Sequence, residues 1–328
     1  MILDIVYLIA GLALILYGAN WLTDGSSAVA RRLGVSDLII GLTVVALGTS
    51  TPELVITIVS AIGGNAPLAV GNIVGSNIFN ILVIIGLVAV ISPIRVERSV
   101  MTTEIPLVVL SALILLVMAN SQLLDGATDR VISRSDGLIL LVFFILFMRH
   151  TFMSAHIEPE PELDPAAERP RKTKEMAMWR AIVMILAGLG ALIVGGDRFV
   201  AGASAIASMM GVSDAVIGLT IVAIGTSLPE LATSVVAARK GAGGLAIGNV
   251  IGSCVMNIFL ILGVGATITP LALGGVTQVD LLTMTAASVL FWWTARFGGT
   301  RVINRVEGAL MLVIYAAYTA WLVVSATA

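Results

Sequence analysis

Two glutamates stand alone among apolar residues, and they are the first candidates for chemistry in this sequence. Glu53 is the only ionisable residue between positions 38 and 91, and Glu230 is the only acid between 215 and 268. Neither has an obvious basic partner, because the two bases of the second segment, Arg239 and Lys240, are expected to lie at a helix end. A charge in apolar surroundings is unfavourable unless it is paired or neutralised. We therefore expect a mobile cation, either a proton or a metal ion, to neutralise these carboxylates.

Each glutamate lies near the end of a hydroxyl-rich motif that occurs twice in the sequence. The stretch Gly41–Leu54, GLTVVALGTSTPEL, returns as Gly218–Leu231, GLTIVAIGTSLPEL, with eleven of fourteen positions identical. A proline directly before each glutamate is expected to break the incoming helix and to free backbone carbonyls. Inside a membrane such carbonyls are tolerated only where they line a cavity or bind something. The candidate ligands of this motif are Thr49, Ser50, Glu53, Thr226, Ser227 and Glu230.

The same residues can also be interpreted as a capping box. In that motif Ser caps a helix and Glu three residues later returns the hydrogen bond. The motif suits a helix start in water, whereas here each copy lies about twelve residues into an apolar span. We favour an ion site, with local capping as an accompanying role.

A second repeated motif supplies further oxygen ligands. Gly71–Gly86, GNIVGSNIFNILVIIG, returns as Gly248–Gly263, GNVIGSCVMNIFLILG. Its Ser and Asn are four residues apart and share one helix face, which adds Ser76, Asn80, Ser253 and Asn257 to the candidates. The glycines at 71, 75, 248 and 252 are expected to allow close helix packing.

Every candidate ligand is a hard oxygen atom. Calcium takes six to eight such ligands in a flexible cage, whereas zinc or copper prefers His and Cys. Cys254, which stands where the first repeat has Asn77, is expected to be a small buried hydrophobe. His150 and His156 give little support for a metal site.

Composition identifies the solvent as lipid. Hydrophobic residues make up 58% of the chain, charged residues 12%, and the mean hydropathy is +1.06. Because a spanning helix needs about 20 mostly apolar residues, we predict an all-α integral membrane protein. The first span lacks a basic region before it and is expected to be permanent, not a cleaved signal peptide. The ten predicted spans cover residues 3–22, 37–62, 67–91, 103–120, 136–150, 179–200, 214–238, 244–268, 277–296 and 306–325.

The repeats divide the chain into two halves. The offset of 177 residues that relates the two motifs also relates GVSD at Gly34–Asp37 to GVSD at Gly211–Asp214. We predict a first five-helix repeat over 1–150, a charged cytoplasmic linker over 151–178, and a second repeat over 179–328. Five helices are an odd number, so the second repeat is inverted in the membrane and the shared site lies near the bilayer midplane.

The basic residues predict the orientation. With both termini outside, fifteen of the eighteen Lys and Arg residues face the cytoplasm, and only Arg130, Arg134 and Arg198 face outward. This asymmetry follows the positive-inside rule and predicts a multi-pass protein of the cell inner (plasma) membrane.

The paired GTSxPE and GNxxGSxxxN segments resemble the alpha repeats of the cation/calcium antiporter superfamily, specifically its prokaryotic sodium/calcium exchangers. The resemblance covers essentially the whole chain except the linker. It implies Ca²⁺ and Na⁺ coordination by the two glutamates, hydroxyl and carbonyl ligands from the GTS segments, and supporting contacts from the Ser and Asn pairs. It also implies alternating access, with the first and sixth helices sliding against a fixed core. In some archaeal relatives the position that matches Asn257 is aspartate, whereas both repeats here carry Asn.

Three functions stay open at this point. The first is a secondary antiporter that exchanges Ca²⁺ for Na⁺ by alternating access, and the second replaces Na⁺ by H⁺ at the same glutamates. The third is a passive cation channel, which inverted symmetry favours less. We expect no enzyme activity, because no span carries a catalytic triad, HExxH or P-loop signature. We also expect no cofactor beyond the transported ions and no nucleic-acid partner, and the oligomeric state stays open, a monomer included.

Overall fold

The computed structural model describes residues 2–122, 126, 129–154, 176–209, 223–297 and 301–327, and these residues are helical almost throughout. The all-α class predicted from composition is confirmed. Several predicted features lie outside the described residues: the linker segment 157–174, His156, the second GVSD at 211–214 and the first five residues of 218–231.

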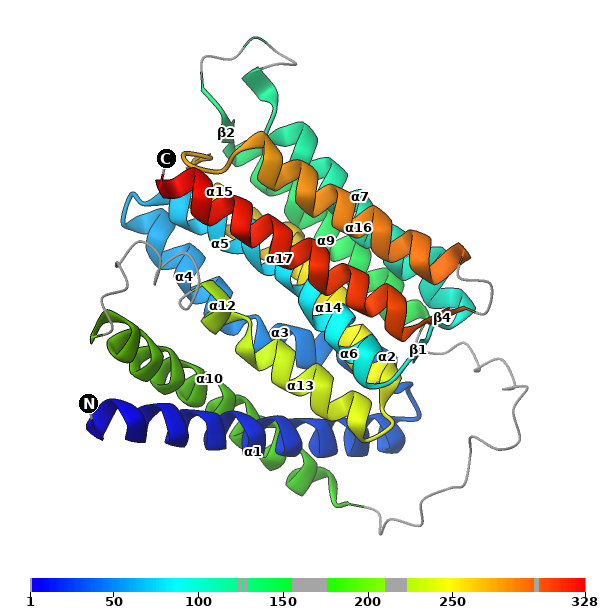
Figure 1. The fold of residues 1–328 in the computed structure, drawn as a ribbon. Coiled ribbons are helices and arrows are strands. Elements are labelled where there is room, and N and C mark those ends of the chain that lie inside the picture. The colour runs from blue at the N-terminus through cyan, green and yellow to red at the C-terminus, as the bar shows by residue number, and fades with distance from the viewer. Residues whose placement is uncertain are drawn as a thin grey trace.

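The helices, with π-helical segments labelled η, fall into two groups along the chain (Figure 1). The first group is α1 (Ile2–Leu33), α2 (Asp37–Ile40), η1 (Gly41–Val45), α3 (Ala46–Thr49), α4 (Thr51–Ile62), α5 (Ala66–Phe79), η2 (Asn80–Ile85), α6 (Gly86–Ile91), η3 (Val100–Glu104), α7 (Ile105–Met118) and α9 (Arg134–Ser154). The second group is α10 (Met178–Met209), α12 (Ala223–Thr226), α13 (Leu228–Arg239), α14 (Gly243–Met256), η5 (Asn257–Leu262), α15 (Gly263–Ile268), α16 (Gln278–Phe297) and α17 (Arg305–Thr327).

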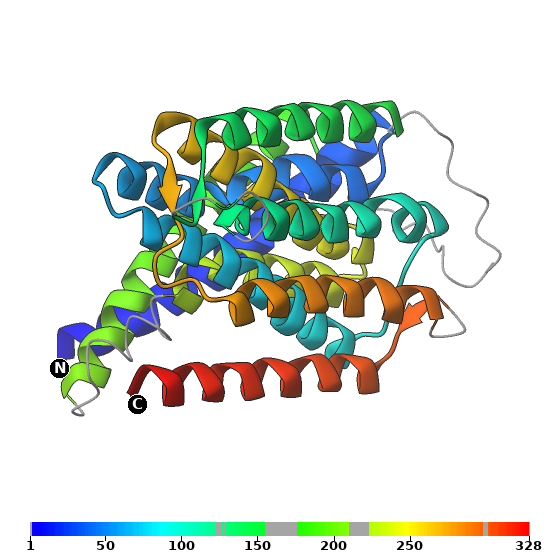
Figure 2. The same cartoon turned by 90° about the horizontal axis from the view of Figure 1, so that it is seen from above.

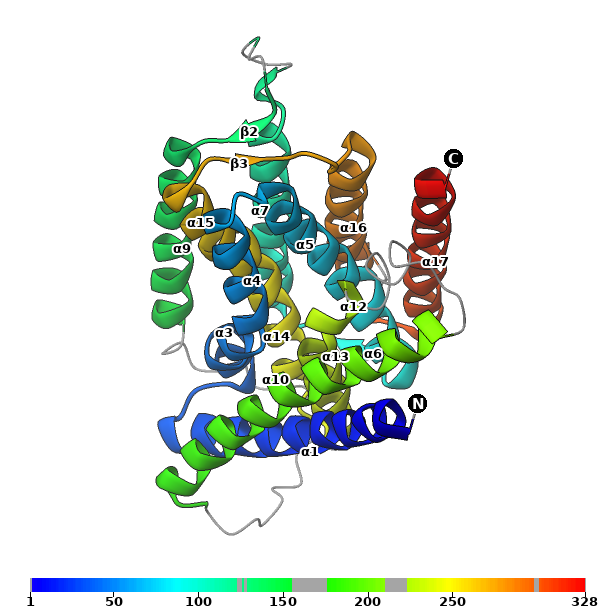
Figure 3. The same cartoon turned by 90° about the vertical axis from the view of Figure 1, so that its left-hand side faces the viewer.

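Two apolar helical rods form the centre of the molecule. One is α5–η2–α6, and 78% of its most apolar stretch is buried; the other is α14–η5–α15, with 94% buried. A helix that is apolar on all sides is expected to be buried, and Figure 3 shows α5 and α14 surrounded by the other helices. The second repeated motif therefore lies in the core of the protein.

Both central rods change to π-helix at an equivalent asparagine. The π-helical segments begin at Asn80 and at Asn257, and each runs for six residues. A π-helical turn is wider than an α-helical turn and occurs frequently at functional sites. The sequence repeat is thus matched by a repeat in backbone geometry.

The helices that carry the glutamates are broken, as predicted. The first bends by 45° between α3 and α4, at Ser50, and the second is interrupted at Ser227 between α12 and α13. Pro52 and Pro229 lie in the first turn after each break, where a helix does not need the missing backbone N–H group. Each glutamate is consequently held in the first turn of a new helix.

Helices α1 and α10 form a separate pair on one face of the bundle. Each has 32 residues, about 48 Å at 1.5 Å per residue, which exceeds the hydrocarbon thickness of about 30 Å and requires an oblique path. Figures 1 and 3 show them side by side, inclined to α7, α9 and α17. A Cβ at Gly18 would lie 2.8 Å from the carbonyl oxygen of Gly188, so the two backbones touch. This packing makes the pair one rigid unit.

Two short strand pairs connect the halves of the chain. Strand β1 (Ile94–Arg95) pairs with β4 (Val302–Ile303), and β2 (Val131–Ile132) pairs with β3 (Leu271–Ala272), both antiparallel. Figure 2 shows β3 and β4 at opposite ends of the bundle, with α1 passing behind the other helices. The strand hydrogen bonds therefore tie the two halves of the core to one another without involving α1 or α10.

The described residues support fewer membrane spans than the ten predicted from sequence. Seven described helices are long and apolar enough to cross a membrane, or eight when the bent pair at Ser50 is taken as one span. Of the two other predicted spans, 214–238 begins outside the described residues. The span 277–296 forms helix α16, but its polar residues give this helix a lower mean hydropathy than the seven spans.

Candidate ion-binding site

Glu53 and Glu230 are both buried at the interface between the two halves. Each side chain is 1% exposed and follows a helix break, so each carboxylate lies in the first turn of a helix. The positive end of the helix dipole favours a negative charge there, by about 0.3–1 kcal/mol at exposed sites. The two carboxylates are near enough to repel one another electrostatically. The structure thus brings together the two acids that the sequence singled out.

The carboxylate of Glu230 is bound by hydroxyls from both repeats. Ser50 Oγ donates to Glu230 Oε1 at 2.9 Å, and Ser253 Oγ lies 3.5 Å from the same oxygen. Ser50 Oγ is also 3.0 Å from Ser253 Oγ. The GTS motif of the first half therefore meets the glutamate of the second half.

Glu53 has the reciprocal surroundings. The hydroxyls of Thr226 and Ser227, from the second GTS motif, lie beside its carboxylate. Within the described residues, however, neither carboxylate oxygen of Glu53 has a hydrogen-bond partner. Oε2 of Glu230 also lacks one. A buried carboxylate oxygen without a partner is strongly unfavourable. These oxygens are therefore candidates for cation ligands.

The two threonines of the GTS motifs form crossed pairs with asparagines. Thr49 Oγ1 donates to Asn249 Oδ1 at 3.1 Å, and Thr226 Oγ1 donates to Asn72 Oδ1 at 3.4 Å. Asn249 also donates to Ser234 Oγ at 3.0 Å. Asn72 and Asn249 were not among the candidates from sequence. They occupy equivalent positions in the two copies of GNxxGS, and that signal could have identified them.

The Ser and Asn candidates of the second motif lie in the same buried region. Ser76, Asn80, Ser253 and Asn257 are at most 2% exposed. Ser76 Oγ, Asn80 Oδ1 and Asn257 Oδ1 have no hydrogen-bond partner in the described part of the chain. Unpaired buried acceptors of this kind suit a hydrated or partly hydrated ion. Nine of the ten candidates are buried and Thr226 is half-buried, and the binding role of each stays a prediction.

The capping-box interpretation is wrong for the serine hydroxyls. Ser50 and Ser227 are the N-cap residues of α4 and α13, yet neither side chain makes a capping hydrogen bond. Ser50 instead donates across the repeat interface to Glu230. Tertiary contacts, not local capping, decide the direction of this hydroxyl.

The packing role of the glycines is confirmed for the second repeat. A Cβ at Gly248 would lie 2.4 Å from the carbonyl oxygen of Leu38, and one at Gly252 would lie 2.7 Å from that of Leu42. A Cβ at Gly71 would be 3.8 Å from Val276 Cγ2, and one at Gly75 would meet no described atom within 4 Å, so the packing role of these two glycines stays a prediction. Cys254 is fully buried and unoxidised, in agreement with its predicted role as a small hydrophobe.

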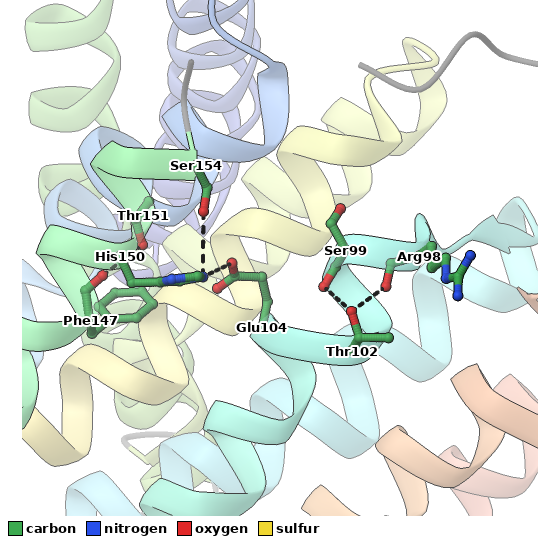
Figure 4. A network of polar contacts seen from close by, with 8 residues as sticks. All are labelled: Arg98, Ser99, Thr102, Glu104, Phe147, His150, Thr151 and Ser154. Carbon is green, nitrogen blue, oxygen red and sulfur yellow. Dashed lines mark hydrogen bonds and ion pairs between the residues drawn. The ribbon is translucent and has the colours of Figure 1, made fainter. Parts of the chain in front are cut away.

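His150 lies in a helix that continues beyond the predicted span 136–150. It belongs to the last turns of α9, and its Nε2 is 3.4 Å from Glu104 Oε1 at the start of α7. Figure 4 shows this imidazole between Glu104 and Ser154, separate from the hydroxyl contacts of Thr102. No group of three or more His, Cys, Asp or Glu side chains suited to a metal occurs within the residues described. The central cluster of the described residues combines two carboxylates with hydroxyl and amide oxygens.

Comparisons with known proteins agree with this arrangement. The family model described as sodium/calcium exchanger protein matches residues 3–153 and 180–324. The sodium/calcium exchanger MaX1 of Methanosarcina acetivorans is 31% identical, over 95% of this chain and 96% of that protein. The inner membrane protein YrbG of Escherichia coli is 39% identical, over 82% of this chain and 81% of that protein.

Solved structures show the same fold. A structure of the sodium-calcium exchanger NCX_Mj soaked with Na⁺ and Ca²⁺ has a TM-score of 0.82 and 33% sequence identity, and the match covers 98% of both chains. Several helices long and apolar enough to cross a membrane, together with the match to an exchanger family, identify a multi-span membrane transporter. The chain belongs to the sodium/calcium exchanger protein family.

Proposed function

We propose that this protein is a secondary antiporter that exchanges Ca²⁺ for Na⁺ by alternating access at a site near the bilayer midplane. One observation carries the proposal: Glu53 and Glu230, from equivalent broken helices, lie buried in one cluster of oxygens supplied by both halves. The names of MaX1 and NCX_Mj support the choice of ions.

The charge of the site limits what it binds. Two ionised carboxylates balance the charge of one Ca²⁺ or of two Na⁺ ions. Calcium and sodium therefore compete for the same negative charge. Asn257 supplies a dipole where some relatives have a carboxylate. A third Na⁺ would have to bind without a counter-charge of its own.

The ten proposed ligands are those selected from sequence. Glu53 and Glu230 hold the ion charge; Thr49, Ser50, Thr226 and Ser227 supply hydroxyl or carbonyl oxygens; Ser76, Asn80, Ser253 and Asn257 complete the shell. Their residue types agree with the oxygen coordination that Ca²⁺ requires.

Alternating access is proposed to come from sliding of the α1–α10 pair against the core. The pair contacts the core beside the GTS motifs, where Leu189 lies against Gly48 and Val200 against Gly225. The pair also packs on α13, where Lys240 lies 2.9 Å from Asp24 of α1, but the backbones of α1 and α10 touch one another along their length. The pair can therefore move as a unit past Thr49 and Thr226. The proposed frame is ten helices in two inverted repeats, 1–150 and 179–328, joined by a cytoplasmic linker.

Proton exchange is the second candidate, and it makes a different prediction. If Na⁺ and Ca²⁺ share the oxygens of one site, raising Na⁺ should weaken Ca²⁺ binding, and Ca²⁺ should weaken Na⁺ binding by the same factor. Calorimetry in detergent measures both. Calcium uptake into proteoliposomes with an imposed Na⁺ gradient, repeated with a pH gradient, then separates the coupling ions. Calcium affinity that ignores Na⁺ but depends steeply on pH would establish the proton-coupled alternative.

The proposed topology is a multi-pass protein of the inner membrane with both termini outside. The basic asymmetry of the connections supports it, as does the name of YrbG, an inner membrane protein. Single cysteines at the positions of Arg31, Arg95, Arg239 and Arg301 should react only from the cytoplasmic side, and one at Arg130 only from outside. The cysteines are introduced into a Cys254→Ala background. Labelling of the Arg95 and Arg130 positions from the same side would refute this topology.

A further inference from the structure

Within the second repeated motif, the two halves differ in polarity at one pair of equivalent positions. Asn77 in the first half corresponds to Cys254 in the second. Asn77 is 1% exposed and reaches across the interface to the second half, where it contacts both the backbone of Cys254 and the side chain of Asn257. The contact therefore acts on only one of the two equivalent site amides.

The hydrogen bonds of Asn77 have a direction that follows from their partners. Its Nδ2 lies 3.2 Å from the carbonyl oxygen of Cys254, and a carbonyl oxygen can only accept. The NH₂ group of Asn77 must therefore face Cys254, so its Oδ1 faces Asn257. Asn257 in turn donates its own Nδ2 to that oxygen at 3.0 Å. Amide orientations are assigned from such networks, and here a backbone group determines the assignment.

The consequence appears at the other end of the Asn257 amide. With Nδ2 engaged, Oδ1 points away from Asn77, and it is buried without a hydrogen-bond partner among the described residues. Asn257 lies one helical turn after Ser253 and on the same face, and Ser253 contacts Glu230. A pure acceptor is thus presented at the glutamate cluster.

Asn80, the equivalent amide of the first half, lacks this control. The residue that corresponds to Asn77 is Cys254, and its thiol lies beside Asn80. A thiol is a weak donor and a weak acceptor, so it distinguishes poorly between the two ends of an amide. The two asparagines of the site are therefore chemically unequal despite the repeat.

We propose that Asn77 is a positioning residue that locks the Asn257 amide with its oxygen toward the bound cation. Both polar atoms of Asn77 are engaged within the protein, so it acts through Asn257 and is not a ligand itself. The proposal deepens the proposed function and rests on it. It makes cation affinity depend on a side chain that never touches the ion.

The test uses the symmetry of a carboxylate. Asn77→Ala and Asn77→Leu, the second of which fills the volume, should each lower Ca²⁺ affinity and Na⁺-driven Ca²⁺ flux about tenfold, equivalent to about 1.4 kcal/mol. In an Asn257→Asp background the same substitutions should have no effect or raise the affinity. An aspartate side chain ends in two oxygens, so either orientation presents an oxygen to the cation. In that background, Asn77 Oδ1 would repel the carboxylate.

The outcomes separate positioning from packing. A purely structural Asn77 would cause the same loss with Asn257 intact and in the Asn257→Asp background, and that result would overturn the proposal, as would unfolding of both Asn77 variants. Ser111→Ala serves as the matched control, because it deletes another buried hydrogen-bonding group, on α7, away from the site. Absence of Na⁺-driven Ca²⁺ flux in the wild-type protein would contradict the exchanger function instead. Calorimetry and proteoliposome flux, with thermal melting of each variant, give the readouts.

Discussion

Glu53→Gln and Glu230→Gln should each abolish Ca²⁺ exchange while leaving the protein folded. Two unit charges 4 Å apart interact by about 4 kcal/mol at an effective dielectric constant of about 20. Losing one carboxylate opposite a divalent ion should therefore lower Ca²⁺ affinity by at least about a thousandfold. Glutamine keeps the side-chain shape and an acceptor for Ser50, and it removes a charge that is costly inside a membrane. The two losses should be similar because the halves contribute equivalent acids.

Gradient-driven ⁴⁵Ca²⁺ flux and thermal melting in detergent measure this result. Glu104→Gln is a matched control, because Glu104 is also buried in an apolar helix but pairs with His150 away from the site. Its flux should stay near the wild-type value. Asn257→Ala should reduce flux less than either glutamate substitution, since an amide supplies a dipole and not a charge. Normal transport by either Glu→Gln variant, or loss of transport only through unfolding, would show that these glutamates are structural.

Gly248→Ala should lower stability severely, by about 3 kcal/mol or more. The added Cβ would lie 2.4 Å from the carbonyl oxygen of Leu38 and 3.0 Å from the backbone nitrogen of Leu42. Both neighbours are backbone atoms, so no side-chain rotation relieves the overlap. The helix carrying Ser253 and Asn257 would have to separate from the broken helix of the first half. Thermal melting should therefore fall together with Ca²⁺ affinity.

Gly243→Ala on the same helix is the control for this substitution. A Cβ at Gly243 meets no described atom within 4 Å, and Ala is favoured over Gly in helices by up to about 1 kcal/mol. Its melting temperature should be equal to that of the wild type or higher. Equal behaviour of the two variants would show that α14 does not need the close approach.

The sequence by itself determined the membrane environment, the duplication and the identity of the two acids. Unbroken apolar runs require helices, because lipid cannot satisfy exposed backbone groups. Two glutamates without basic partners in such runs point to a cation. The breaks at Ser50 and Ser227 were also predictable, since a proline inside an apolar helix removes a local hydrogen bond. Each of these features depends on local chemistry.

The tertiary structure alone decided which half supplies which ligand. Ser50 lies three residues before Glu53 but donates to Glu230. Thr49 Oγ1 is 3.1 Å from Asn249 Oδ1 in the other half, closer than the 3.4 Å to the carbonyl oxygen of Ala46 in its own motif. Local sequence also allowed a capping role for Ser50, but its hydroxyl makes its contact across the interface and no capping hydrogen bond. Asn77 likewise makes a side-chain contact that local sequence does not indicate, with Asn257, 180 residues away. Sequence periodicity specifies helix faces, but the directions of buried hydroxyls and amides depend on the atoms that packing brings opposite them.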